Sequence, residues 1–135
     1  SDPVLRERIR VLGFRGDVAD LIDAADFIVH PSHEDALPTA LISALAGAKP
    51  IVATNVGGIP DIVGPGCGTL VESGNPAALS SGIAEMASAA LHDSTAFADM
   101  RQAARDRYES NFSADVWVKN LRSVYQNAID ARRRG

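Results

Sequence analysis

Residues 31–50 read PSHEDALPTALISALAGAKP and connect two short apolar runs, 27–30 and 50–54. The beginning of the stretch carries two prolines and a His-Glu-Asp run, which predicts a loop. From Pro38 onward apolar residues recur at helical spacing, so we predict a helix that begins near Pro38 and ends near Gly47. The stretch therefore predicts a strand, a loop, a helix and a second strand, with the loop at the carboxyl end of the first strand.

The same alternation of strands and helices continues on both sides of this unit. The apolar runs do not alternate with polar residues, which is typical of strands that are covered on both faces in a parallel sheet. We expect a strand at 9–14, a helix at 17–25, strands at 27–30 and 50–54, a helical turn at 59–63, a strand at 69–71, and helices capped by Asn75, Ser94 and Ser113. The predicted fold is α/β, a Rossmann-like parallel sheet with flanking helices and a helical C-terminus. In the last helix, we expect Trp117, Leu121, Val124 or Tyr125, and Ala128 to face inward, as packing anchors.

Composition indicates one ordinary globular domain over residues 1–135. The formal net charge of −4 argues against binding to nucleic acid. The single cysteine, Cys67, excludes an internal disulfide and a metal cluster built from several cysteines. No apolar run approaches the roughly 20 residues that cross a bilayer, so we expect a cytoplasmic protein without an integral membrane segment.

Two loops, 31–38 and 55–61, follow neighbouring strands and are expected to form one cleft at the same edge of the sheet. In the second loop, Gly57-Gly58 would let the backbone approach a ligand closely, or would simply make a tight turn. In the first loop, the His33-Glu34-Asp35 run is either solvated or supplies a carboxylate that orients a ligand rich in hydroxyls.

The predicted helix adds hydroxyl groups and a helix N-terminus to this cleft. Thr39 and Ser43 are four residues apart and share one helix face, near the end where an anion would bind. The alternative for Ser43 is a serine that is exposed or bonded to its own helix. We interpret His30, at the end of an apolar strand, as a core residue, and the histidine spacing predicts no metal site.

Residues 31–54, followed by 56–63, resemble the donor-binding lobe of retaining glycosyltransferases of the GT-B fold, in the glycosyltransferase group 1 (GT4-like) family. The resemblance extends upstream through 11–26 and downstream through 68–79 and the helix that follows Phe112, so it covers nearly the whole chain. It implies a nucleotide-sugar substrate, no cofactor and no metal ion.

The family carries a Glu-x7-Glu signature, whose first acid contacts the donor sugar and whose second acid binds the ribose. Asp35 and Ser43 stand at the matching positions, so the resemblance implies a catalytic role for Asp35 and a serine in place of the ribose ligand. The backbone of 37–41 corresponds to the diphosphate cradle, and 56–61 resembles the family's Val-Gly-Gly-x-Pro-Glu loop. The implied donor-binding residues are His33, Glu34, Leu37, Pro38, Thr39, Ala40, Leu41, Ser43, Gly57 and Gly58.

The family's basic Arg/Lys pair, the first βα unit of its donor lobe and its N-terminal acceptor-binding lobe have no counterpart in these residues. We therefore expect a domain truncated at its N-terminal side, inactive alone and prone to self-association. Ser43 prompts an alternative from another class: a non-catalytic or degenerate domain that binds a nucleotide-sugar or a partner. A third interpretation is a sugar epimerase of the same architecture.

Overall fold

A parallel sheet forms the centre of the computed structural model, which describes residues 3–134. Within these residues the sheet has three strands in the order β1 (Ile28–His30), β2 (Ile51–Thr54) and β3 (Gly68–Val71). Val29 pairs with Val52, which in turn pairs with Thr69. The expected α/β class with a parallel sheet is confirmed.

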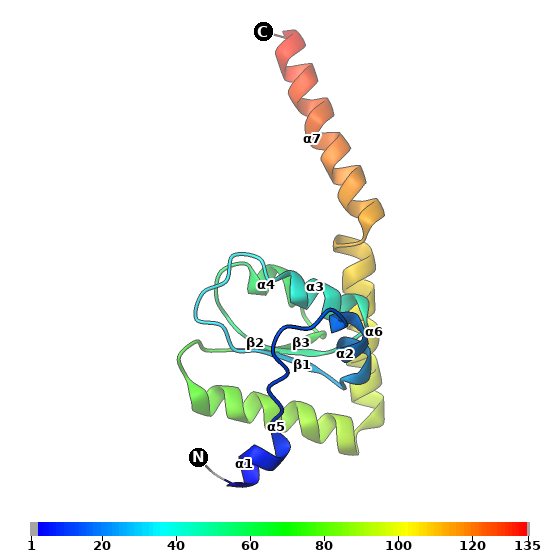
Figure 1. Cartoon of the computed structure of the whole chain (residues 1–135). Coiled ribbons are helices and arrows are strands. Elements are labelled where there is room, and N and C mark those ends of the chain that lie inside the picture. The colour runs from blue at the N-terminus through cyan, green and yellow to red at the C-terminus, as the bar shows by residue number, and fades with distance from the viewer. Residues whose placement is uncertain (1–2, 135) are drawn as a thin grey trace.

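Helices cover both faces of the sheet (Figure 1). One face carries α3 (Thr39–Ala46) and α4 (Ile59–Ile62), with α6 (Ser94–Asn111) packed against α3. The opposite face carries α5 (Pro76–His92). The structure is therefore a three-layer α/β/α arrangement, as the sequence pattern predicts.

All four residues of β2 are buried, and their side chains alternate between the two helical layers. Ile51 and Ala53 belong to the core cluster on the side of α3, which also contains Leu41 and Leu45. On the side of α5, a Cβ atom at Gly82 would lie 3.2 Å from Cγ1 of Val52. The missing side chain at this glycine lets α5 lie close to the sheet.

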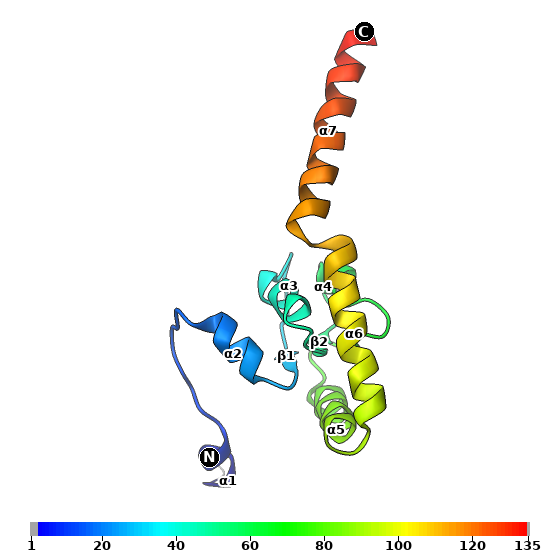
Figure 2. The same cartoon turned by 90° about the vertical axis from the view of Figure 1, so that its right-hand side faces the viewer.

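The predicted strand at 9–14 is wrong. The described residues begin with α1 (Pro3–Arg8), continue without regular structure, and enter α2 (Val18–Ala24). Val11 and Phe14 are 93% and 102% exposed, and the segment stands away from the sheet (Figure 2). A short apolar run forms a strand only when a neighbour supplies backbone hydrogen bonds, and this segment does not reach the open edge of β1.

The helix caps agree with the sequence in one case and differ in two. Asn75 caps α5 as predicted, because its side chain accepts a hydrogen bond from the Ala78 N–H at 3.0 Å. The cap of α6 is Asp93 and not Ser94, since the Asp93 carboxylate accepts from the Ala96 N–H. The Ser113 hydroxyl donates to the Glu109 carbonyl of the preceding helix and accepts no hydrogen bond from the described N–H groups of α7, so it does not act as the predicted cap.

The last helix, α7 (Ala114–Arg134), projects beyond the body of the molecule (Figures 1 and 2). Phe112, just before it, packs against the core. Trp117, Val124 and Tyr125 are 62–63% exposed, and the prediction that they face inward is therefore wrong. The reason is that α7 leaves the body near its start, so the described part of the chain offers these side chains no surface.

Two arginines of α6 hold the carboxyl ends of the helices that follow the candidate loops. Nη1 of Arg105 donates to the Ala46 carbonyl at 2.6 Å, at the end of α3. Arg107 donates to the Asp61 and Ile62 carbonyls at the end of α4, at 2.6 and 3.2 Å. A cation at a helix C-terminus satisfies free carbonyls and complements the helix dipole, so α6 fixes both helices in place.

No helix of residues 3–134 is both long enough and apolar enough to cross a membrane.

Candidate functional site

The loops that follow the three strands gather at one edge of the sheet, on the left in Figure 1, because parallel strands all end there. These are residues 31–38 after β1, 55–58 after β2, and 72–75 after β3. The sequence predicts a site at the carboxyl edge of the sheet, and the three loops do lie together at that edge.

The loops after β1 and β2 touch through their backbones. A Cβ atom at Gly57 would lie 1.9 Å from the Asp35 carbonyl oxygen, and one at Gly58 would lie 2.1 Å from that of Ala36. The Gly58 N–H donates to the Asp35 carbonyl at 3.2 Å, and Gly57 has a φ of +51°. The two glycines therefore let the loop after β2 pack closely against the backbone of residues 35 and 36.

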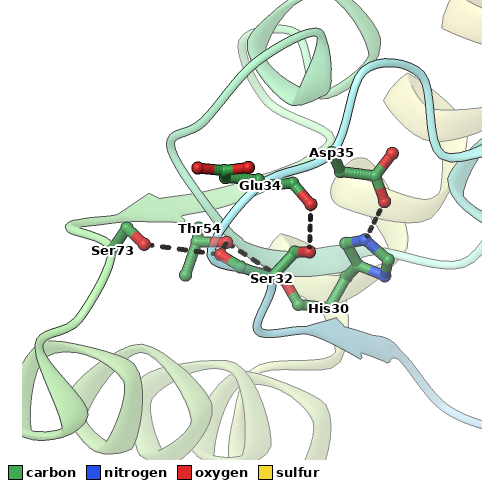
Figure 3. A network of polar contacts seen from close by, with 6 residues as sticks. All are labelled: His30, Ser32, Glu34, Asp35, Thr54 and Ser73. Carbon is green, nitrogen blue, oxygen red and sulfur yellow. Dashed lines mark hydrogen bonds and ion pairs between the residues drawn. The ribbon is translucent and has the colours of Figure 1, made fainter.

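Asp35 is held at its side chain as well. Its Oδ2 lies 3.0 Å from Nε2 of His30, the last residue of β1 (Figure 3). The two side chains are 27% and 26% exposed, so the pair is partly buried yet open to a ligand. His30, interpreted from the sequence as a core residue, in fact faces the loop that carries the predicted acid.

A second set of polar contacts fixes the beginning of the loop after β1. The Ser32 carbonyl accepts a hydrogen bond from Oγ1 of Thr54 at 2.6 Å and from Oγ of Ser73 at 3.4 Å, and Oγ of Ser32 donates to the Glu34 carbonyl at 3.0 Å (Figure 3). The end of β2 and the loop after β3 thus both bond to one carbonyl of the loop after β1. The sequence reasoning missed Thr54 and Ser73, although a hydroxyl at the end of the buried run 50–54 was an available signal.

The N-terminus of α3 opens toward the same edge. Pro38, near which the sequence predicts the start of the helix, occupies the N-cap position, and no side chain caps the helix. Thr39 and Ala40 are exposed, whereas Pro38 and Leu41 are buried. Thr39 and Ala40 are thus the exposed residues at the start of the helix. The free N–H groups of a first helical turn attract anions.

The remaining predicted side chains are exposed to solvent, and only Ser43 among them is bonded to its own helix. Ser43 is exposed, and its Oγ donates to the Thr39 carbonyl one turn earlier, at 3.2 Å. It is therefore a serine bonded to its own helix. This contact places both residues on one helix face, as the spacing predicts. His33, Glu34 and Leu37 are exposed on the loop.

A cavity of about 190 Å³ lies beside this loop, toward α5. Its walls are Pro31, Ser32, His33, Thr54, Glu72, Gly74, Asn75, Pro76 and Leu79. Of the predicted donor-binding residues only His33 lines it. The cavity and the Asp35 carboxylate are therefore separate features of one edge.

The surroundings of Cys67 disfavour a reactive thiol. The Cys67 thiol is buried and donates to the Gly64 carbonyl at 3.1 Å. Burial raises the pKa of this thiol, which keeps it protonated and poorly nucleophilic. Across residues 3–134, no three His, Cys, Asp or Glu side chains are placed to hold a metal ion.

Comparison with known proteins gives one family match and several relatives. The model of the family described as glycosyl transferases group 1 matches residues 2–89. N-acetyl-alpha-D-glucosaminyl L-malate synthase of Bacillus anthracis is 27% identical over 126 residues, which are 93% of this chain and 32% of that protein.

Solved structures agree with the observed fold. A glycosyltransferase from Rickettsia africae has a TM-score of 0.85 at 26% identity, over 93% of this chain and 33% of its own. HepE of Anabaena, solved in complex with UDP, has a TM-score of 0.79 at 24% identity, over 92% of this chain and 34% of its own. The present chain spans about a third of the length of each of these three proteins.

Proposed function

The chain belongs to the family of group 1 glycosyl transferases, and from this premise we propose that it forms the donor-binding lobe of a retaining glycosyltransferase. The proposed substrate is a nucleotide-sugar, whose sugar passes to an unidentified acceptor. The observation that carries the proposal is the junction of two loops around Asp35, beside the uncapped N-terminus of α3. The reducing cytoplasm is the proposed location.

Each part of this edge suits one part of a nucleotide-sugar. The free N–H groups at Thr39 and Ala40, with the helix dipole, would receive the diphosphate. The Asp35 carboxylate would accept hydrogen bonds from sugar hydroxyls, as the resemblance implies. Positive charge that stabilises the departing diphosphate would come from elsewhere in a longer protein. HepE, a protein of the same fold, was crystallised with UDP-glucose, which supports uridine nucleotides as the first probes.

Ser43 favours a second candidate, a degenerate domain that binds a nucleotide-sugar or a partner without catalysis. A carboxylate at this position would accept two charge-assisted hydrogen bonds from a ribose, whereas the Ser43 hydroxyl is already bonded to the Thr39 carbonyl. The third interpretation, an epimerase, has no particular contact in its favour.

Isothermal titration calorimetry of the 135-residue chain tests the proposal with UDP, UDP-glucose and the corresponding ADP and GDP compounds. We expect saturable binding of one nucleotide series, and weaker binding of its sugar form to Asp35→Asn. Binding that appears only in Ser43→Glu would support the degenerate domain. Absence of binding to every nucleotide, in both the original chain and Ser43→Glu, would contradict both candidates.

A further inference from the structure

We propose that His30 is a positioning residue for the donor sugar, because it holds the Asp35 carboxylate in the orientation that receives sugar hydroxyls. This inference rests on the proposed function and adds to it a residue that neither the family signature nor the sequence reasoning assigns to the site.

The contact joins a rigid element to a loop. His30 ends β1, where it is paired in register with Ala53 of the central strand. Asp35 lies five residues later in the loop, and its carboxylate would be free to rotate without a partner. Since Nε2 of His30 lies 3.0 Å from Oδ2, the strand defines where the carboxylate points. The ring nitrogen can donate to a carboxylate in both the Nε2–H neutral form and the protonated form.

Asp35 is held from both ends. Its carbonyl accepts from the Gly58 N–H of the neighbouring loop, while its carboxylate faces His30. Oδ1 receives no hydrogen bond from residues 3–134, and the side chain is 27% exposed. One oxygen is thus used for positioning, and the other remains available to a ligand. Preorganisation of this kind strengthens binding because the ligand does not have to order the side chain itself.

The decisive experiment compares two probes, UDP and UDP-glucose, by calorimetry on the full 135-residue chain. His30→Phe keeps an aromatic ring but removes the N–H donor, and His30→Gln keeps a donor at similar reach. His92→Phe, at the exposed end of α5, is the matched control. We expect His30→Phe to raise the Kd for UDP-glucose about 10-fold, as for one lost charge-assisted hydrogen bond, and to leave the Kd for UDP unchanged. His30→Gln and His92→Phe should both stay near the original values.

The pattern of losses separates this inference from its premise. An equal loss for UDP and UDP-glucose in His30→Phe would overturn it, because that result indicates a purely structural histidine. No loss for either probe, or a further loss when His30→Phe is added to Asp35→Asn, would also overturn it. If the original chain binds neither probe nor any other nucleotide, the proposed function fails first and the inference falls with it.

If the His30 variants do not fold, NMR of the histidine rings tests the same contact without any substitution of His30. Ring ¹⁵N shifts of the three histidines would be compared between the original chain and Asp35→Asn. The inference requires a change at His30 alone, with His33 and His92 unaffected. Unchanged His30 shifts would contradict the contact and overturn the proposal.

Discussion

Gly57 and Gly58 are residues whose lack of a side chain determines the geometry of the candidate site. Their Cβ positions are occupied by the backbone of residues 35 and 36. A side chain at either position would separate the two loops or distort both. The glycines thus contribute to the placement of Asp35 whether or not they contact a ligand.

We predict that Gly58→Ala destabilises the fold by about 1–3 kcal/mol, the typical cost of forcing atoms into occupied space, because its Cβ would lie 2.1 Å from the Ala36 carbonyl oxygen. Urea denaturation measures the change. Gly16→Ala is the matched control, since nothing lies within 4 Å of that Cβ position. Equal stability of the two variants would show that the loops separate at no cost.

The buried thiol of Cys67 predicts a pH dependence of stability. Burial raises the pKa of this thiol in the folded chain, so the unfolded chain releases the proton first as the pH rises. Above the ordinary thiol pKa of about 8.5, the free energy of unfolding should therefore fall with pH. Denaturation at pH 7 and pH 9.5, for the original chain and for Cys67→Ala, isolates this contribution. A pH dependence that is the same in both proteins would contradict the prediction.

At the scale of elements, α6 connects the site to the rest of the fold. Its arginines bind the carboxyl ends of α3 and α4, the two helices that begin at the candidate loops. The loop after β2 reaches the core through Val56. The placement of the loops also depends on helices whose far ends are anchored by α6.

We predict that Arg107→Met lowers the free energy of unfolding by about 1 kcal/mol, because the Asp61 carbonyl loses its donor and the Ile62 carbonyl keeps only the Gly64 N–H. Thermal and urea denaturation both report this loss. Arg122→Met, on the exposed surface of α7, provides the comparison for loss of a surface charge. The idea is wrong if both variants unfold at the same urea concentration.

The sequence predicts elements well where the local pattern and the burial agree. The strands at 50–54 and 69–71 and the helix after Asn75 are found within one residue, because apolar runs and a strong cap define them. The predicted strand at 9–14 fails because pairing depends on a neighbour that no local pattern reveals. The prediction of an inward face on α7 fails for a similar reason. Amphipathic spacing predicts which side of a helix is apolar, but it does not predict which surface, if any, covers that side.

For the site, the sequence predicts the edge but not the contacts. Parallel alternation alone brings 31–38 and 55–61 to one edge of the sheet. The pairing of His30 with Asp35 depends on the path of the intervening loop, and the packing of Gly57 on Asp35 depends on how two loops curve. Neither follows from spacing.

At the scale of the whole molecule, α7 is a helix with an apolar stripe and little to cover it. Trp117, Val124 and Tyr125 are each more than 60% exposed, at helical spacing. Among residues 3–134, β1 also pairs on one side only. Uncovered apolar faces and open strand edges both favour association between copies.

We predict that the isolated chain self-associates at micromolar concentration and that Trp117→Lys with Tyr125→Lys reduces this association. The fold should remain as stable as before, because neither side chain is buried in the body. Light scattering after size-exclusion chromatography measures the mass, and Gln126→Lys on the polar face of α7 is the control. A monomer at all concentrations would refute the prediction.

The backbone contact between 35–36 and 57–58 also has a meaning for protein engineering. The two loops fit each other closely, so they have to be exchanged as one unit, although some twenty residues of helix and strand separate them in the chain. A swap of 31–38 for the corresponding loop of a relative would bring a backbone shaped for a different neighbour. Any exchange intended to alter ligand preference should therefore transfer both segments together.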